Sequence, residues 1–96
     1  MLWTWDPVKN CTNRRKHGLG LDTAALVFGD PLAASRPDPE AREERWQTIG
    51  LVGTVVIVVV HTTPRRDPGD GVEVGRIISA RKATRHERRA YEEGDF

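Results

Sequence analysis

The spacing of hydrophobic and polar residues predicts five strands, one of them buried on both faces. Val55 to Val60 is apolar at both parities, as expected for a strand at the centre of a sheet. Gly53 marks a tight hairpin turn before it. The predicted strands cover residues 2–5, 32–35, 45–51, 54–62 and 72–81, of which 32–35 has the weakest pattern.

Capping residues mark the first two predicted helices. The Asp6–Pro7 pair favours a helix start, because Asp accepts hydrogen bonds from free amides and Pro suits the first helical position. Glycine adopts the left-handed conformation of a helix C-cap more easily than any other residue, so this helix should end at Gly18. Asp22 is expected to cap a second, shorter helix, and Leu21 before the cap and Leu26 within the helix are placed to form a hydrophobic staple.

A third helix is predicted near the C-terminus. Thr84 and Glu87 have the spacing of a capping box, and the helix should continue to about Glu93. The segment 64–71 is rich in proline and glycine and is predicted to be loop throughout. The element order is therefore roughly βααββββα, an α+β fold. A chain of 96 residues suits a single domain over 1–96, with one sheet and one helical layer.

The composition, 38% hydrophobic and 30% charged, is that of an ordinary soluble globular protein. An apolar run of six residues is far shorter than the roughly twenty that a membrane-spanning helix needs. Residues 1–7 do not have the pattern of a secretory signal. The single cysteine, Cys11, excludes an internal disulfide, and its predicted helix favours a small buried side chain over a nucleophile. We therefore expect a cytoplasmic protein.

The net charge of +1 does not by itself indicate a nucleic-acid ligand, but the charge is unevenly distributed. Acidic residues outnumber basic ones over 31–44, and basic residues outnumber acidic ones over 61–89. Such a distribution can give one face a field that attracts anions. A solvated helix with interleaved charges explains the same pattern equally well.

Three residues near strand ends are candidates for chemistry. His61 closes the most buried strand and could transfer a proton near neutral pH, although a histidine bonded to a neighbouring loop explains the position too. Arg76 interrupts an apolar strand, which indicates an anionic partner, either a carboxylate such as Glu44 or a bound phosphate. Arg81 ends the same strand. The histidines do not have the spacing of a metal site.

These groups suit one reaction that needs no metal, the cleavage of RNA by its own 2′-hydroxyl. A base removes the hydroxyl proton, cations stabilise the charge that grows on the phosphate, and an acid protonates the leaving 5′-oxygen. Arg76 and Arg81 have opposite parity, so they share a face only if the strand bulges or ends before Arg81. A non-catalytic protein- or RNA-binding module is the alternative.

Seven short blocks follow one another along nearly the whole chain. They are Trp5–Pro7, Asn13–Gly18, Phe28–Pro31, Glu43–Gly50, Val58–Thr62, Arg76–Thr84 and Glu87–Glu92. In this order they resemble the BrnT family of toxins, which is similar to the larger RelE-like group of microbial ribonucleases. Each block alone is a weak pattern, whereas the set is specific. The segment 64–71 is longer than the family pattern.

The resemblance implies a small RelE-like fold, an antiparallel-rich sheet with helices packed on one side and a concave side that receives RNA. It implies the toxin of a type II toxin–antitoxin system, an endoribonuclease without metal or cofactor that inhibits growth. It also implies a partner, a cognate antitoxin that is typically a ribbon-helix-helix DNA-binding protein. Such antitoxins usually dimerise, so a hetero-oligomer is expected.

The site residues are assigned with the resemblance in mind. We expect His61 to move protons, and Arg76 and Arg81 to stabilise phosphate charge. Tyr91 lies where RelE-like enzymes often carry a functional tyrosine, but it could equally anchor the last helix to the sheet. For the RNA-binding candidates, favourable helix-dipole interactions or a solvated helix face are the alternatives. These candidates are Lys16, His17, Arg85, Arg88 and Arg89.

Overall fold

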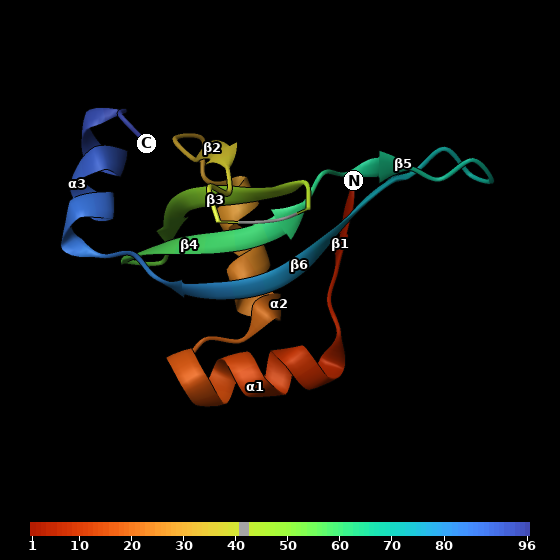
Figure 1. The fold of residues 1–96 in the computed structure, drawn as a ribbon, viewed down its shortest axis with the longest axis horizontal. Helices are drawn as coiled ribbons and strands as arrows, with labels where there is room; N and C mark the ends of the chain where they lie inside the picture. The colour runs from red at the N-terminus through yellow and green to blue at the C-terminus, as the bar shows by residue number, and fades with distance from the viewer. Residues whose placement is uncertain (41–42) are drawn as a thin grey trace.

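A mixed sheet of six strands forms the centre of the computed structural model, which describes residues 1–40 and 43–96 (Figure 1). Arg42, which contributes to the charge pattern over 31–44, lies outside the described residues. The elements are β1 (Leu2–Thr4), α1 (Pro7–His17), α2 (Leu21–Ala24), the 3₁₀ helix η1 (Ala25–Gly29), β2 (Ala34–Pro37), β3 (Arg45–Val52), β4 (Val55–Thr62), β5 (Arg65–Arg66), β6 (Glu73–Lys82) and α3 (Arg85–Glu93).

The strand order is β1-β6-β4-β3-β2, with β5 paired to β6 outside this path. The apolar strand β4 is central, as predicted, and Gly53 forms the hairpin turn before it with φ of 62°. β1 is parallel to β6, and the other pairs are antiparallel. The α+β fold class is confirmed. One prediction about 64–71 is wrong, because Arg65 and Arg66 pair with Val74 and Glu73 as a short strand.

The predicted caps of the first helix are confirmed, whereas the start of the second helix is different. The Asp6 carboxylate accepts a hydrogen bond from the Val8 amide, and Gly18 ends α1 in the left-handed conformation. The second helix begins two residues earlier than predicted, with Gly20 instead of Asp22 as its N-cap. The predicted staple does not form, because Leu21 is buried in the core and Leu26 points to solvent with 63% of its surface exposed.

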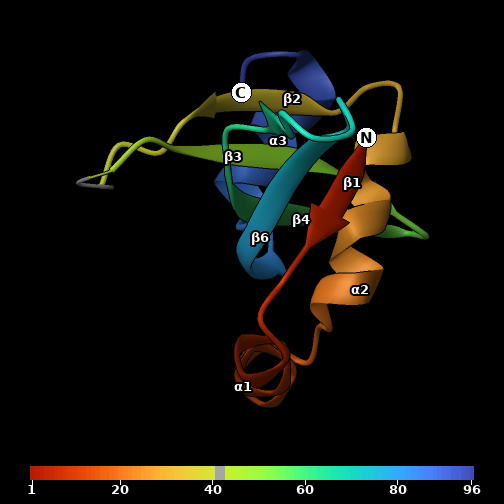
Figure 2. The ribbon, with the colours of Figure 1, turned by 90° about the vertical axis from the view of Figure 1, so that its right-hand side faces the viewer.

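Two apolar clusters lie on opposite faces of the sheet, because side chains alternate between faces along each strand. Leu21 and Val27 of α2 and η1 cover Ile57 and Val59 of β4 on what we call the helix face. The opposite face contributes Val58 to a second, smaller cluster. Figure 2 shows α2 on one side of the sheet and α1 below its edge.

The C-terminal helix packs on the second face, an arrangement that the sequence did not predict. Its capping box forms as predicted, with Thr84 and Glu87 each accepting from the other's amide. Tyr91 and Phe96 then pack against Ile49, Val56 and Val58, so α3 and the C-terminus close one end of this face. No helix of the described residues covers the remainder of the face (Figure 1).

Asn13 is the buried residue of α1 and completes the free edge of β6. Its amide donates to the Ala80 carbonyl at 2.8 Å and accepts from the Ala80 amide at 3.1 Å, which imitates a neighbouring strand. It also donates to the Leu19 carbonyl at 2.8 Å. Because Asn13 occupies the inward side of α1, Cys11 points to solvent, and the prediction of a buried cysteine is wrong.

Among residues 1–40 and 43–96, no helix is long and apolar enough to cross a bilayer.

We predict that Asn13→Ala lowers the free energy of unfolding by about 2 to 4 kcal/mol, because buried backbone groups at Ala80 and Leu19 lose their partners. Urea denaturation followed by circular dichroism measures this loss. Arg15→Ala, on the exposed side of the same helix, should change stability by less than about 0.5 kcal/mol. Equal effects of the two substitutions would contradict the proposed edge contact.

Candidate functional site

One extra residue in β6 determines which side chains share a face of the sheet. Val60 of β4 pairs with Ser79, but the next residue, His61, pairs with Ile77, so Ile78 is an unpaired β-bulge. An extra residue reverses the alternation of side chains beyond it. Arg76 and Arg81 therefore lie on the same face, which meets the condition that the sequence set for a shared site.

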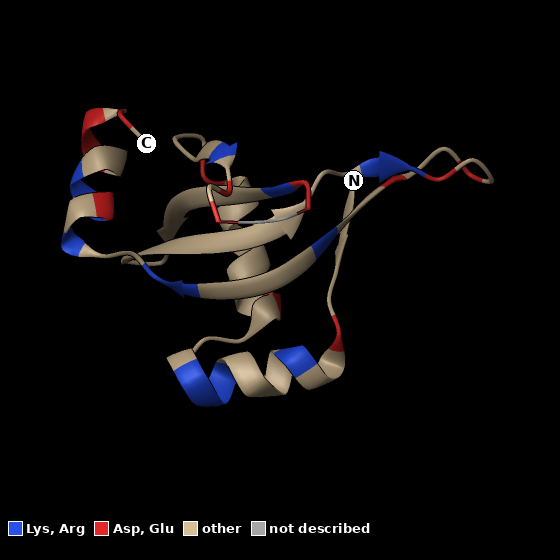
Figure 3. Ribbon diagram, in the orientation of Figure 1, with Lys and Arg blue, Asp and Glu red and all other residues tan. Residues whose placement is uncertain are grey.

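Four arginines from three strands lie on this face, which we call the arginine face. Arg36 pairs with Gln47 and Arg45 with Thr62, which places both on the parity of Val58 and Val60. Arg81 pairs directly with Val58. Figure 3 shows the resulting basic positions on β2, β3 and β6, with further ones along α1. The face comprises Arg36, Arg45, Arg76 and Arg81.

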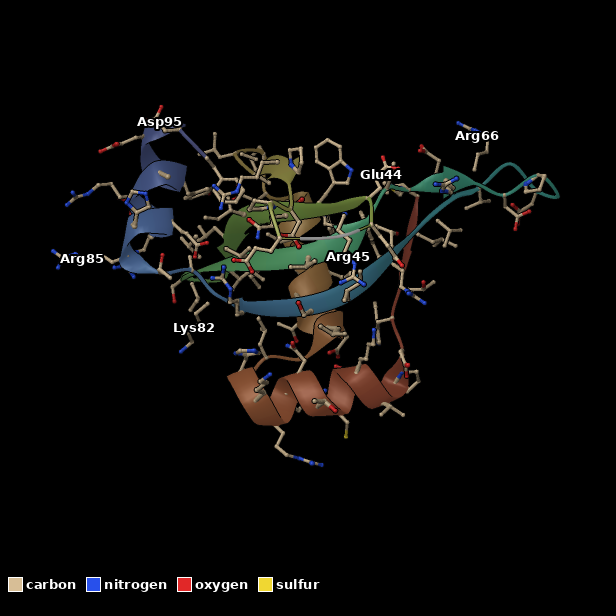
Figure 4. All side chains as sticks on the ribbon, viewed as in Figure 1. Glu44, Arg45, Arg66, Lys82, Arg85 and Asp95 are labelled. Carbon is tan, nitrogen blue, oxygen red and sulfur yellow. The ribbon has the colours of Figure 1, made fainter. Side chains whose placement is uncertain are left out.

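Arg45 and Arg76 form a row across the sheet with Thr62 between them. Arg45 pairs with Thr62, and the Arg76 amide donates to the Thr62 hydroxyl at 3.0 Å. Adjacent strands are about 4.8 Å apart, so the two arginines stand about 10 Å apart across the row. In Figure 4, Arg45 lies in front of the sheet and Glu44 at its upper edge.

Neither arginine of this row has a carboxylate partner among residues 1–40 and 43–96. Glu44, the partner considered for Arg76, instead accepts from the Thr63 hydroxyl at 2.9 Å, so that alternative is wrong. Arg76 is exposed, and Arg45 is half-buried. These two guanidinium groups are therefore free to bind an external anion such as a phosphate.

The other pair of arginines surrounds a carboxylate of α3. Arg81 donates to both oxygens of Glu87, at 2.7 and 2.9 Å, and Arg36 lies 4.0 Å from one of them. The bond from Arg81 is the main reason why the pKa of Glu87 falls to about 2, and it raises the pKa of Arg81 in turn. Glu87 is thus ionised across the physiological pH range.

His61 lies on the opposite, helix face and does not meet the arginines. It pairs with Ile77 of the helix-face core, and only 5% of its surface is exposed. Trp3 and Phe28, which stack on each other at 3.9 Å, contact the imidazole edge-on from 4.9 and 5.2 Å. Gly75 permits this packing, since a side chain there would overlap the Trp3 ring.

Both ring nitrogens of His61 have partners inside the protein. Nδ1 lies 2.8 Å from the Thr62 carbonyl, which can only accept, so this nitrogen carries the proton. Nε2 then accepts from the Thr48 hydroxyl at 2.6 Å, and Ser35 lies 2.7 Å from the same hydroxyl. Burial lowers the pKa of His61, so the ring is neutral at pH 7.

A comparison with protein-family models now adds an independent finding. The model described as the ribonuclease toxin BrnT of type II toxin–antitoxin systems matches residues 5–87. The chain belongs to this BrnT family. Its members are ribonuclease toxins of type II toxin–antitoxin systems, which act with a cognate antitoxin. A comparison with curated proteins gives no match.

In this BrnT-family protein, Tyr91 connects α3 to the turn after η1 by a hydrogen bond. Its hydroxyl donates to Asp30 at 2.5 Å, and the same Asp30 oxygen accepts from the Leu51 amide at 2.7 Å. The bond to Asp30 raises the pKa of Tyr91 to about 12 and lowers the pKa of Asp30. This geometry matches the anchoring role that the sequence left open.

The predicted RNA-binding residues divide into two groups. Lys16 and His17 line a shallow groove between α1 and Ser79, and Ser79 pairs with Val60 on the arginine face. These two therefore border the arginine face. The second group, on α3, is exposed, and two of its members line a cleft with His86. It consists of Arg85, Arg88 and Arg89.

Three residues of the site were not predicted from the sequence: Arg36, Arg45 and Glu87. Every second residue of a strand points to the same face, so Arg45 could have been assigned to one face together with Gln47 and Ile49. The β2 register and the position of α3 gave no such signal. Among the described residues, no group of three or more His, Cys, Asp or Glu side chains is placed to hold a metal ion.

We predict that His61 makes the stability of the fold sensitive to mild acid. Because burial lowers its pKa below the usual value of 6.5, the unfolded chain binds a proton there more readily than the folded protein does. The free energy of unfolding should therefore fall as the pH decreases from about 7.5 to about 5. Urea titrations at several pH values measure this dependence.

The matched variant for this prediction is His61→Gln. It should be less stable than the parent at neutral pH, but its stability should change less between about pH 7.5 and 5. The lowered pKa values of Glu87 and Asp30 act at more acidic pH and should affect both proteins alike. The same pH dependence in both proteins would show that His61 is not the responsible group.

Proposed function

We propose that this chain is a metal-independent endoribonuclease toxin that binds RNA on the arginine face. The observation that carries the proposal is the row of Arg45 and Arg76 on the uncovered part of the sheet, without carboxylate partners among the described residues. Lys16 and His17 extend the basic surface along α1. RNA laid across the strands would meet cations from four elements.

The proposed reaction uses the RNA's own 2′-hydroxyl as the nucleophile. The 2′-oxygen bonds to phosphorus, the bond to the 5′-oxygen breaks, and the proton lost by the former ends on the latter. Arg45 and Arg76 would stabilise the negative charge that develops on the phosphate oxygens. Stabilisation of such charge is usually the largest single contribution to enzymatic rate enhancement. Metal is not required, because the two guanidinium groups supply this charge.

The proposal assigns catalysis to the arginines and not to proton transfer by His61. His61 lies on the opposite face, and its two nitrogens are bonded to Thr48 and Thr62. Tyr91 is assigned an anchoring role because its hydroxyl is bonded to Asp30. The sequence-based hypothesis that His61 and Tyr91 act on RNA stays testable by substitution.

The antitoxin is proposed to be a ribbon-helix-helix protein that covers the arginine face. Family membership supports the existence of a cognate antitoxin. An inhibitor that supplied carboxylates to Arg45 and Arg76 would exclude RNA by occupying the same guanidinium groups. Dimerisation of such an antitoxin would give a hetero-oligomer, and we expect a toxin that cleaves cellular RNA to act in the cytoplasm.

We predict that the purified, antitoxin-free protein cleaves RNA in the presence of EDTA and that Arg76→Ala lowers kcat/KM by about 100-fold or more. Arg45→Ala should have a similar effect. Arg15→Ala removes the same charge from an exposed helix position away from the face and should leave the rate within about twofold of the parent. Circular dichroism verifies that each variant is folded.

Two results would redirect the assignment. Loss of cleavage in a folded His61→Gln protein, with Arg76→Ala fully active, would place the chemistry on the helix face. Salt-dependent RNA binding by the parent without any product would favour the alternative, a non-catalytic RNA-binding module.

A further inference from the structure

Glu87 is the one carboxylate among the described residues that pairs with members of the arginine face. Its side chain is only 12% exposed, whereas the side chains of Arg36 and Arg81 are 41% and 38% exposed. Solvent therefore reaches the two guanidinium groups more easily than it reaches the carboxylate between them. An anion arriving from solvent would meet the arginines first.

The pairing of Arg81 with Glu87 has the geometry with which arginine binds phosphate. Two parallel N–H···O bonds of 2.7 and 2.9 Å join the guanidinium to both carboxylate oxygens. A phosphate presents two oxygens to the same fork, so carboxylate and phosphate compete for one guanidinium. Arg36 approaches the same carboxylate from β2, as a second cation would approach a phosphate.

Arg36 and Arg81 each make contacts that do not involve Glu87. Arg36 donates from Nε to Gln47 at 3.0 Å and stacks on the Phe96 ring at 4.1 Å. Arg81 also donates to the Lys82 carbonyl at 3.3 Å. Glu87 in turn accepts from the Thr84 amide at 2.9 Å. An exchange of the carboxylate for another anion would therefore leave each of the three side chains with a partner.

We infer that Arg36 and Arg81 form a second phosphate-binding subsite on the arginine face and that Glu87 occupies it in the RNA-free protein. The inference rests on the proposed function, since it requires RNA to bind this face. Arg81 is five residues from Arg76 along β6, and one of these residues is the bulge, so their backbones are about 13 to 16 Å apart and the two arginines serve different phosphates. Glu87 then weakens RNA binding by competing for one of them.

Glu87→Gln tests this inference with little disturbance of the fold. Glutamine has the same shape and serves equally well at the third position of a capping box, so α3 should stay in place. The substitution removes the negative charge that holds Arg81. Glu92→Gln is the matched control, because it makes the same charge change at an exposed position of the same helix.

The measurement is the affinity for a 2′-O-methyl RNA oligonucleotide, which cannot be cleaved because the attacking hydroxyl is blocked. Fluorescence anisotropy gives the binding constant between about 50 and about 200 mM KCl, and its logarithm falls with log salt by about 0.7 for each phosphate neutralised on a single strand. Glu87→Gln should bind more tightly than the parent, with a slope steeper by about 0.7. Glu92→Gln should keep the parent's slope.

A double variant, Arg81→Gln with Glu87→Gln, should lose the gain, because the guanidinium that gains a phosphate is absent. The inference is overturned if Glu87→Gln has the parent's slope, or if the double variant keeps the gain. These results are independent of catalysis. Cleavage by the parent with no change of slope would remove the subsite alone, whereas the expected slopes without cleavage would remove the proposed catalytic activity alone.

Discussion

The unpaired residue in β6 is the constraint on which the rest of the site depends. If Ile78 were paired regularly with His61, Arg76 and Arg81 would point to opposite faces, and Arg76 would enter the helix-face core while Ile77 left it. Burying an unpaired guanidinium there would cost several kcal/mol. The bulge lets one strand supply apolar side chains to a core on one face and cations to solvent on the other.

The two faces of the sheet differ in how their polar side chains are satisfied. On the helix face, His61 is bonded to Thr48 and Thr62, and at the edge of β6 the Asn13 side chain bonds the backbone of Ala80. On the arginine face, Arg45 and Arg76 have no such internal partners among the described residues. Unpaired guanidinium groups persist there because they are hydrated, and hydrated cations are what a polyanion displaces when it binds.

Much of the fold could be predicted because local rules agree with the tertiary structure. The caps at Asp6, Gly18 and Thr84 and the apolar run of β4 depend on neighbouring residues in the chain. The predicted helix start at Asp22 is wrong. The helix begins after Gly20, which caps it without a side chain, because Leu21 is buried in the core as the first helical residue, and this burial outweighs the preference for Asp as the N-cap.

The site was predicted only in part, because its residues are brought together by strand register. Arg76 and Arg81 could be named as a pair, and the need for a bulge could be stated, but the bulge itself depends on how β4 and β6 align. Arg36 joins the site through the register of β2, and His61 leaves it by the parity of β4. These relations are long-range and leave no local signal.

The most direct test is a titration of isotope-labelled protein with 2′-O-methyl RNA, followed by NMR at side chains on both faces. We predict that the Nε–H signals of Arg45, Arg76 and Arg81 shift with RNA, while the indole N–H signals of Trp3 and Trp46 on the helix face stay in place. Shifts concentrated at the indoles, with unchanged arginine signals, would contradict the account and place RNA on the opposite face.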